Sequence, residues 1–411
     1  MKLTTLLLTT TLTAVVLFAC AQTTPAPQKA IANAVHTGAE PTTFQSCKDR
    51  NVVDVQGNPD GYLFVKNLVF LLNNFDPYRS SGYNPPTGEH IDPYKSPYAA
   101  DLIAAFNAAP GFFREQLCGL DGVFVNLKCQ DPNNCTPDDA SDNSWGYRET
   151  LGQNPQEPAR RFIAISAVLW GGNPHVDNFY DFETKLLHQL FKRPYGAIWE
   201  GPQYGDPNAN HSENTPAITV LAALAHEFGH VLWYDTFRPA RSNDMWANDF
   251  SRFCSGTFFD DSWALVVAPA GSSQAGTAQP AYPPGPWRNF GDRSSQSHAF
   301  GDVPVSLIDY AIRQNDPIDL FNSRAYSLDG LFRTNGHWAS FFAALSPDED
   351  FIETFKFYVL INANPQVKNL PITIPSPLYP AFRADIYADY RSPGGKGVLA
   401  KKVGCFAAIY H

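Results

Sequence analysis

Residues 215–232 read TPAITVLAALAHEFGHVL. Apolar residues recur at helical spacing along this segment, and Thr215 followed by Pro216 is typical of an N-cap and a first helical position. We therefore predict a helix that begins at Pro216 and buries an apolar face. His226 and His230 are four residues apart, so they lie on one face of this helix, one turn above the other.

This histidine pair has the spacing of a metal-binding motif. Two imidazoles one helical turn apart can each direct a nitrogen at the same zinc ion. Glu227 follows His226 directly, and its carboxylate can reach water held by such an ion and accept its proton as a general base. Gly229 is a poor helix former, but a small residue is tolerable at a position where another segment or a substrate packs closely. The simpler alternative is a pair of ordinary histidines on a core helix.

A catalytic zinc site of this kind needs a third protein ligand. The short metzincin pattern is excluded, because it would need Gly at position 233 and His or Asp at position 236, where the chain has Trp233 and Thr236. An Asp-ligand class similar to deuterolysin would use Asp260, although its surroundings miss that pattern by one residue. We keep Asp260 as a weak alternative.

Two acidic residues later in the chain are better placed. Glu349 and Glu353 are the only glutamates after Glu227, and they belong to SPDEDFIETF at residues 346–355. We predict a buried helix that begins at Pro347 and carries both carboxylates on one face. Glu349 could instead form a capping box with Ser346, and Glu353 could pair with Lys356.

The two segments together resemble the gluzincin metallopeptidases, and most closely the anthrax-lethal-factor-type peptidase domain and related zinc-peptidase lipoprotein families. The resemblance implies an α+β, zincin-like fold with a catalytic HExxH helix, a small sheet and a second helix that bears the glutamates. It also implies one Zn²⁺ per chain, with His226, His230 and Glu349 as ligands and Glu353 orienting a metal-bound histidine. The interval of 119 residues between His230 and Glu349 is longer than is usual for such enzymes.

Gluzincins also use a Tyr or His to stabilise the transition state from the side opposite the general base. The candidates for this donor are Tyr234, His337 and Tyr358, ranked only by their proximity in sequence to the two helices.

Composition and the N-terminus indicate an exported protein. The 411 residues include 30 basic and 40 acidic residues, and the net charge of −10 argues against a nucleic-acid-binding surface. We interpret residues 1–19 as a signal peptide of the lipoprotein type, with Cys20 as the lipidated residue and the outer membrane or cell surface as the destination. The alternative is cleavage at an A-x-A site and plain secretion.

The remaining organisation follows from composition. Residues 20–45 are predicted to form a flexible tether, residues 46–411 the peptidase domain with an N-terminal extension, and residues 268–287 a Pro/Gly-rich insertion. An even number of cysteines in an exported chain predicts up to three disulfides, in pairings the sequence does not determine. These cysteines are Cys47, Cys118, Cys129, Cys135, Cys254 and Cys405. Periodicity further predicts helices at residues 62–74, 99–117 and 181–192, and strands at residues 123–125 and 162–168.

The sequence thus predicts an exported zinc metallopeptidase that hydrolyses a peptide or protein substrate. One rival hypothesis is a surface-binding lipoprotein with a non-catalytic metalloprotease-like domain. The other is a zinc hydrolase of a non-peptide substrate. The intact Glu227 argues against the first, because a site without catalysis has no chemical need for that carboxylate.

Overall fold

The structure is a computed structural model of the whole chain. It describes residues 45–72, 89–127, 145–150, 159–170, 176–186, 203–205, 212–237, 266–267, 278–279, 339–340, 343, 347–374, 382–391 and 398–410. The predicted signal peptide, Cys20, almost all of the tether and most of the insertion lie outside these residues. Among the helices that are described, none is both long and apolar enough to cross a membrane.

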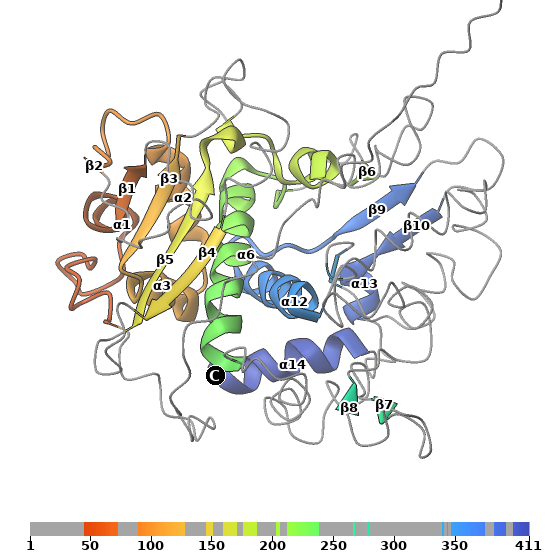
Figure 1. Cartoon of the computed structure of the whole chain (residues 1–411). Helices are drawn as coiled ribbons and strands as arrows, with labels where there is room; N and C mark the ends of the chain where they lie inside the picture. The colour runs from red at the N-terminus through yellow and green to blue at the C-terminus, as the bar shows by residue number, and fades with distance from the viewer. Residues whose placement is uncertain are drawn as a thin grey trace, which may run out of the picture.

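A five-stranded mixed sheet forms one side of the molecule, with the order β2-β1-β3-β5-β4 (Figure 1). The three central strands β1, β3 and β5 run parallel, while β2 and β4 pair antiparallel at the two edges. Their bounds are β1 Val69–Leu72, β2 Glu89–His90, β3 Gly122–Asn126, β4 Trp145–Thr150 and β5 Ala159–Ser166. The predicted strands at 123–125 and 162–168 correspond to β3 and β5, except that residues 167–168 belong to a 3₁₀ turn (Ala167–Trp170).

The strands alternate their side chains between the two faces of this sheet. Val123, Val125, Ile163 and Ile165 belong to the main hydrophobic core, together with side chains of the helices α2 (Ala99–Ala108), α3 (Gly111–Cys118) and α6 (Pro216–Phe237). Phe124 and Phe162 point the other way, into a smaller cluster. The core side of the sheet is therefore the side that carries α6.

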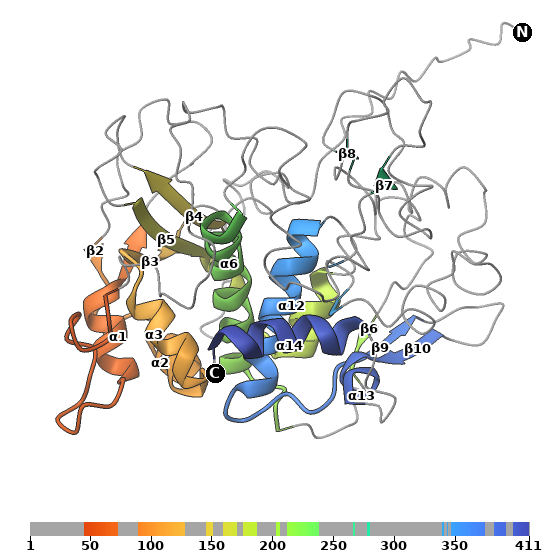
Figure 2. The same ribbon diagram turned by 90° about the horizontal axis from the view of Figure 1, so that it is seen from below.

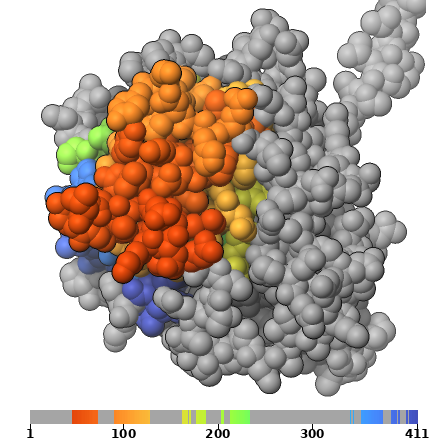
Figure 3. All heavy atoms as spheres, turned by 90° about the vertical axis from the view of Figure 1, so that its left-hand side faces the viewer, coloured from red at the N-terminus to blue at the C-terminus, as the bar shows by residue number. Residues whose placement is uncertain are grey.

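Two predicted helices differ from the structure. The segment predicted as one helix at 62–74 is α1 (Gly61–Leu68) followed immediately by strand β1. The segment 99–117 is two helices, α2 and α3, separated at Ala109 and Pro110. On the side of the molecule that Figure 3 shows, the described residues before β4 form one continuous surface, coloured red to orange.

The C-terminal part surrounds a second long helix, α12 (Pro347–Asn362), which packs between α6 and α14 (Val398–Tyr410) (Figures 1 and 2). A three-stranded antiparallel sheet, β10-β9-β6, lies beside it with the short helix α13. The bounds are β6 Gln203–Tyr204, β9 Pro371–Ile374, β10 Phe382–Asp385 and α13 Ile386–Arg391, and a separate pair joins β7 Val266–Val267 with β8 Ala278–Gln279. The chain is therefore a mixed α+β protein with small sheets.

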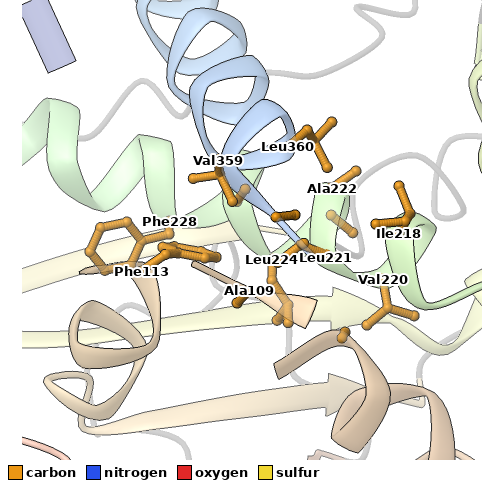
Figure 4. Packing of buried hydrophobic residues seen from close by; sticks show 14 of the residues in the cluster. Ala109, Phe113, Ile218, Val220, Leu221, Ala222, Leu224, Phe228, Val359 and Leu360 are labelled. Carbon is orange, nitrogen blue, oxygen red and sulfur yellow. The ribbon is translucent and has the colours of Figure 1, made fainter. Parts of the chain in front are cut away.

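Apolar contacts hold the two long helices together. Side chains of α6, including Leu221, Leu224 and Phe228, lie in one cluster with Val359 and Leu360 of α12 (Figure 4). The ring of Phe228 contacts Phe113 of α3 at a centroid distance of 5.5 Å and Phe355 of α12 at 5.8 Å. Burial of this apolar surface fixes the distance between α6 and α12.

A disulfide ties the start of the described chain to α3. Cys47 and Cys118 are bonded, with 4.9 Å between their Cα atoms, and both are fully buried. Cys405 in α14 is also disulfide-bonded. Cys129, Cys135 and Cys254 lie outside the described residues.

Candidate metal centre

Helix α6 presents the two histidines as its sequence predicts. The helix begins at Pro216, and the backbone N–H of Ile218 donates to the hydroxyl of Thr215 at 3.3 Å, so Thr215 caps it. The helix continues unbroken past the motif to Phe237. The rings of His226 and His230 lie 5.1 Å apart between centroids, with an interplanar angle of 78°.

This separation of the two rings fits a shared zinc ion. A histidine nitrogen binds zinc at about 2.1 Å, and two such rings around a tetrahedral ion have centroids roughly 5 Å apart. Burial, together with the charge of the neighbouring His226, lowers the pKa of His230 to about 3, although the charge of Glu353 opposes this shift. The ring is therefore neutral, which is the form that binds metals.

Glu353 of α12 contacts the first of these histidines directly. Its Oε1 lies 2.7 Å from Nδ1 of His226, and its side chain is 1% exposed. Burial alone would raise the pKa of Glu353, but the charge of Lys356 and the hydrogen bond to His226 outweigh it and lower the pKa to about 2. Because an ionised carboxylate can only accept a hydrogen bond, Nδ1 must carry the proton, and Nε2 is then the nitrogen suited to a metal.

The other oxygen of Glu353 is also occupied. Oε2 accepts from Nζ of Lys356 at 2.7 Å and from the hydroxyl of Ser340. The same ammonium contacts Oε1 of Glu183 at 3.2 Å. With both oxygens bonded to donors, Glu353 is placed to orient His226 and poorly placed to bind a metal itself.

Glu227, which follows His226 on α6, is also buried, with 4% of its surface exposed. Burial raises the pKa of its carboxyl to about 7, partly opposed by His226 and reinforced by Glu353. Its Oε2 has no hydrogen-bond partner among the described residues. A buried carboxyl oxygen without a partner is costly unless a ligand, a water or a metal completes its bonding.

The other predicted site residues are placed less completely. Glu349 is the third residue of α12, one turn before Glu353, but its side chain lies outside the described part of the chain, as does that of Tyr234 in α6. His337, Asp260 and Ser346 are outside it altogether. Among the described residues, no group of three His, Cys, Asp or Glu side chains could hold a metal ion.

Tyr358, the third candidate for the transition-state donor, lies in an aromatic cluster. Its ring is 1% exposed, stacks on Phe112 of α3 at 5.0 Å and lies 6.4 Å from Tyr410 of α14. These contacts place the side chain in the packing between three helices. This position argues against Tyr358 as the transition-state donor.

The sequence pattern did not point to two members of this group, Glu183 and Ser340. Glu183 belongs to a helical segment at residues 179–186 and lies 173 positions from Lys356 in the sequence.

Comparison with protein-family models, with curated protein sequences and with solved structures gave no match. The chemistry of the site is therefore argued from its own residues.

Proposed function

We propose that this protein is an exported zinc-dependent metallopeptidase with a zincin-like fold. The observation that carries the proposal is the pair His226 and His230 on α6, at the spacing of a shared zinc ion, with Glu353 bonded to Nδ1 of His226. Glu349, one turn before Glu353 on α12, is the proposed third ligand. Oε2 of the buried Glu227, which has no hydrogen-bond partner among the described residues, also favours a bound ligand in this region.

The residues of the chain divide the chemistry between them. A bound zinc ion supplies Lewis acidity, which lowers the pKa of water and polarises a scissile carbonyl group. Glu227 takes the proton from the attacking water and later gives it to the leaving amine nitrogen, so that it ends each turnover as a carboxylate. A carboxyl group with a pKa near neutrality can perform both transfers. Tyr234 and His337 remain the proposed transition-state donors.

The edge of the main sheet supports a peptide as the substrate. Strand β4 packs against α6 and is the last strand in the order of that sheet, with β5 as its partner on one side. Its other edge has no strand partner among the residues described. An extended peptide could pair with such an edge, whereas a small non-peptide substrate gains nothing from it.

We propose an oxidising, extracytoplasmic location. The Cys47–Cys118 disulfide favours such a compartment, because structural disulfides persist there. Cys20 would then carry the lipid anchor to the outer membrane or cell surface, with plain secretion as the other route.

The test is metal analysis of the purified mature chain beside a peptidase assay on a mixed peptide library. We expect about one zinc per chain, cleavage that a chelator abolishes, and restoration by added zinc. Glu227→Gln should keep zinc and lose turnover, because an amide cannot accept the proton. Absence of bound zinc even after zinc is supplied would overturn the proposal. Zinc without peptide cleavage would favour a non-peptide substrate or a binding role.

A further inference from the structure

A buried row of polar groups extends from His226 into the protein interior. Nδ1 of His226 contacts Oε1 of Glu353, Oε2 of Glu353 contacts Nζ of Lys356, and that Nζ contacts Oε1 of Glu183. The three distances are 2.7, 2.7 and 3.2 Å, in that order. The side chains of Glu353, Lys356 and Glu183 are 1%, 8% and 2% exposed.

The row joins residues of three elements of the fold. His226 belongs to α6, Glu353 and Lys356 to α12, and Glu183 to the helical segment 179–186. Figure 2 shows α6 and α12 side by side, as their packing requires. The row therefore connects the candidate metal centre to a third element that contributes no predicted ligand.

The ammonium group of Lys356 lies between two carboxyl groups and holds one of them in place. A buried ammonium needs several acceptors to offset the loss of water, and here two carboxyl groups supply them. Glu183 fixes the end of a long, flexible side chain, so that the ammonium stays against Oε2 of Glu353. Ser340 donates to the same oxygen. With Oε2 held in this way, Oε1 has one direction available, and the ring of His226 lies in that direction.

A simple charge pair would not need this arrangement. One carboxylate three residues earlier on the same helix is enough to pair with an exposed lysine. Burying the pair and adding a second carboxyl group from another segment costs free energy of solvation. That cost is offset if a fixed Glu353 raises the affinity of His226 for a metal, because the partners of ligating histidines tune metal binding.

We propose that Lys356 and Glu183 are positioning residues that act through Glu353 to fix the ring and the Nδ1–H tautomer of His226. The consequence for metal affinity rests on the proposed function, whereas the consequence for the tautomer does not. Neither residue would contact the substrate or the metal.

Zinc affinity of the mature protein, measured by competition with a chromophoric chelator, tests the first consequence. Lys356→Met should weaken zinc binding by about 10–100-fold, the usual effect of losing such a partner. In a Glu353→Gln background the same change should cause little further loss, because Lys356 acts through that carboxylate. Unchanged affinity in Lys356→Met, or losses that add in full, would overturn the proposal.

Two further variants separate positioning from stability. Phe357→Leu changes a buried ring of the same helix that packs on Tyr387 and Tyr390 of α13, so it should lower Tm and leave zinc affinity unchanged. Glu183→Gln combined with Lys356→Met removes the ammonium together with its second acceptor and should fold better than Lys356→Met alone, because Glu183 is then no longer a carboxylate buried without its ion partner. Its zinc affinity should stay low. Recovery of wild-type affinity in that double variant would contradict a positioning role.

The zinc-free protein supplies the second readout. Nitrogen chemical shifts of the His226 ring, measured by NMR, report which nitrogen carries the proton. We expect the Nδ1–H tautomer in the wild type and a mixture of tautomers in Lys356→Met. If the wild type binds no zinc, the proposed function fails while this measurement still decides the positioning role. An identical tautomer in both proteins would overturn that role alone.

Discussion

Gly229 of α6 lies directly against Ile352 of α12. A Cβ atom added to Gly229 would come within 2.9 Å of Cγ2 and 3.2 Å of Cα of Ile352. The first distance is shorter than side chains tolerate, and the second involves backbone. This contact lies between the two histidines on one helix and next to Glu353 on the other, so it sets the distance across which Glu353 reaches His226.

Gly229→Ala should therefore move the two helices apart. Alanine gains up to about 1 kcal/mol of helix propensity over glycine, but overpacking of a core contact costs about 1–3 kcal/mol. We expect a net loss of stability in chemical denaturation, together with weaker zinc binding. Zinc binding weakens because α12 carries Glu353 and Glu349.

Gly404 provides the matched control. It lies inside α14, it is exposed, and no atom outside its own helix lies within 4 Å of an added Cβ. Gly404→Ala should therefore stabilise the protein by about 0.5–1 kcal/mol and leave zinc affinity unchanged. Equal gains in stability from the two alanine variants would show that the Gly229 contact is not tight.

Local signals in the sequence were sufficient for the two long helices. Thr215-Pro216 and Pro347 predicted where α6 and α12 begin, and both helices begin at those prolines. The prediction of one helix over residues 62–74 was right for residues 62–68 and wrong for residues 69–72, which form β1. A short apolar run fits a buried helix and a buried strand equally well. In the structure Val69–Leu72 pairs with β3, a contact with residues more than 50 positions away that no local pattern reports.

The candidate site likewise contains some residues that the local sequence predicted and others that it did not. The spacing of His226 and His230 is a property of one helix, so the sequence was enough to place them together. The contact of His226 with Glu353 spans 127 residues and was expected only from the family resemblance. For Glu183 no signal existed, because its partner Lys356 lies on a helix far away in the sequence.

Glu227 should make the stability of the zinc-free protein depend on pH. Burial raises the pKa of its carboxyl to about 7, from an ordinary value of 4.5. The folded state then binds the proton more tightly than the unfolded state, so folding is favoured at low pH and stability falls as the pH rises from about 4.5 through 7. The loss from this group is about 3 kcal/mol, at about 1.4 kcal/mol per pKa unit.

The contribution of Glu227 to stability can be isolated by comparing wild type with Glu227→Gln. Denaturation curves of both proteins would be recorded from pH 4 to 8 in the presence of a chelator. The amide does not titrate, so the difference between the two proteins should favour the variant increasingly as the pH rises. A difference that does not change with pH would mean that the carboxyl of Glu227 is not held in a buried, desolvated position.

The Cys47–Cys118 disulfide should contribute strongly to stability. It joins residues 71 positions apart and so restricts a long segment of the unfolded chain. Replacing both cysteines with alanine should cost about 2–5 kcal/mol in denaturation. Because neither cysteine belongs to α6 or α12, zinc affinity per folded molecule should not change. A loss of zinc binding in the folded variant would show that this segment supports the site.

Glu349 and Glu353 should respond differently to the same conservative change. Glu349→Gln keeps the shape of the side chain and the capacity for a capping box, since Glu and Gln both serve there, but it removes a carboxylate ligand. We expect it to lose most of its zinc affinity at an almost unchanged Tm. Glu353→Gln should weaken zinc binding by about 10–100-fold and also lower Tm, because Lys356 loses a charged partner. The contrary outcome would identify Glu349 as a capping residue. In that case Glu349→Gln binds zinc normally, while Glu349→Ala loses about 0.5–2 kcal/mol of stability. Asp260 would then be the first position to test as the third ligand, because both oxygens of Glu353 are already bonded to donors.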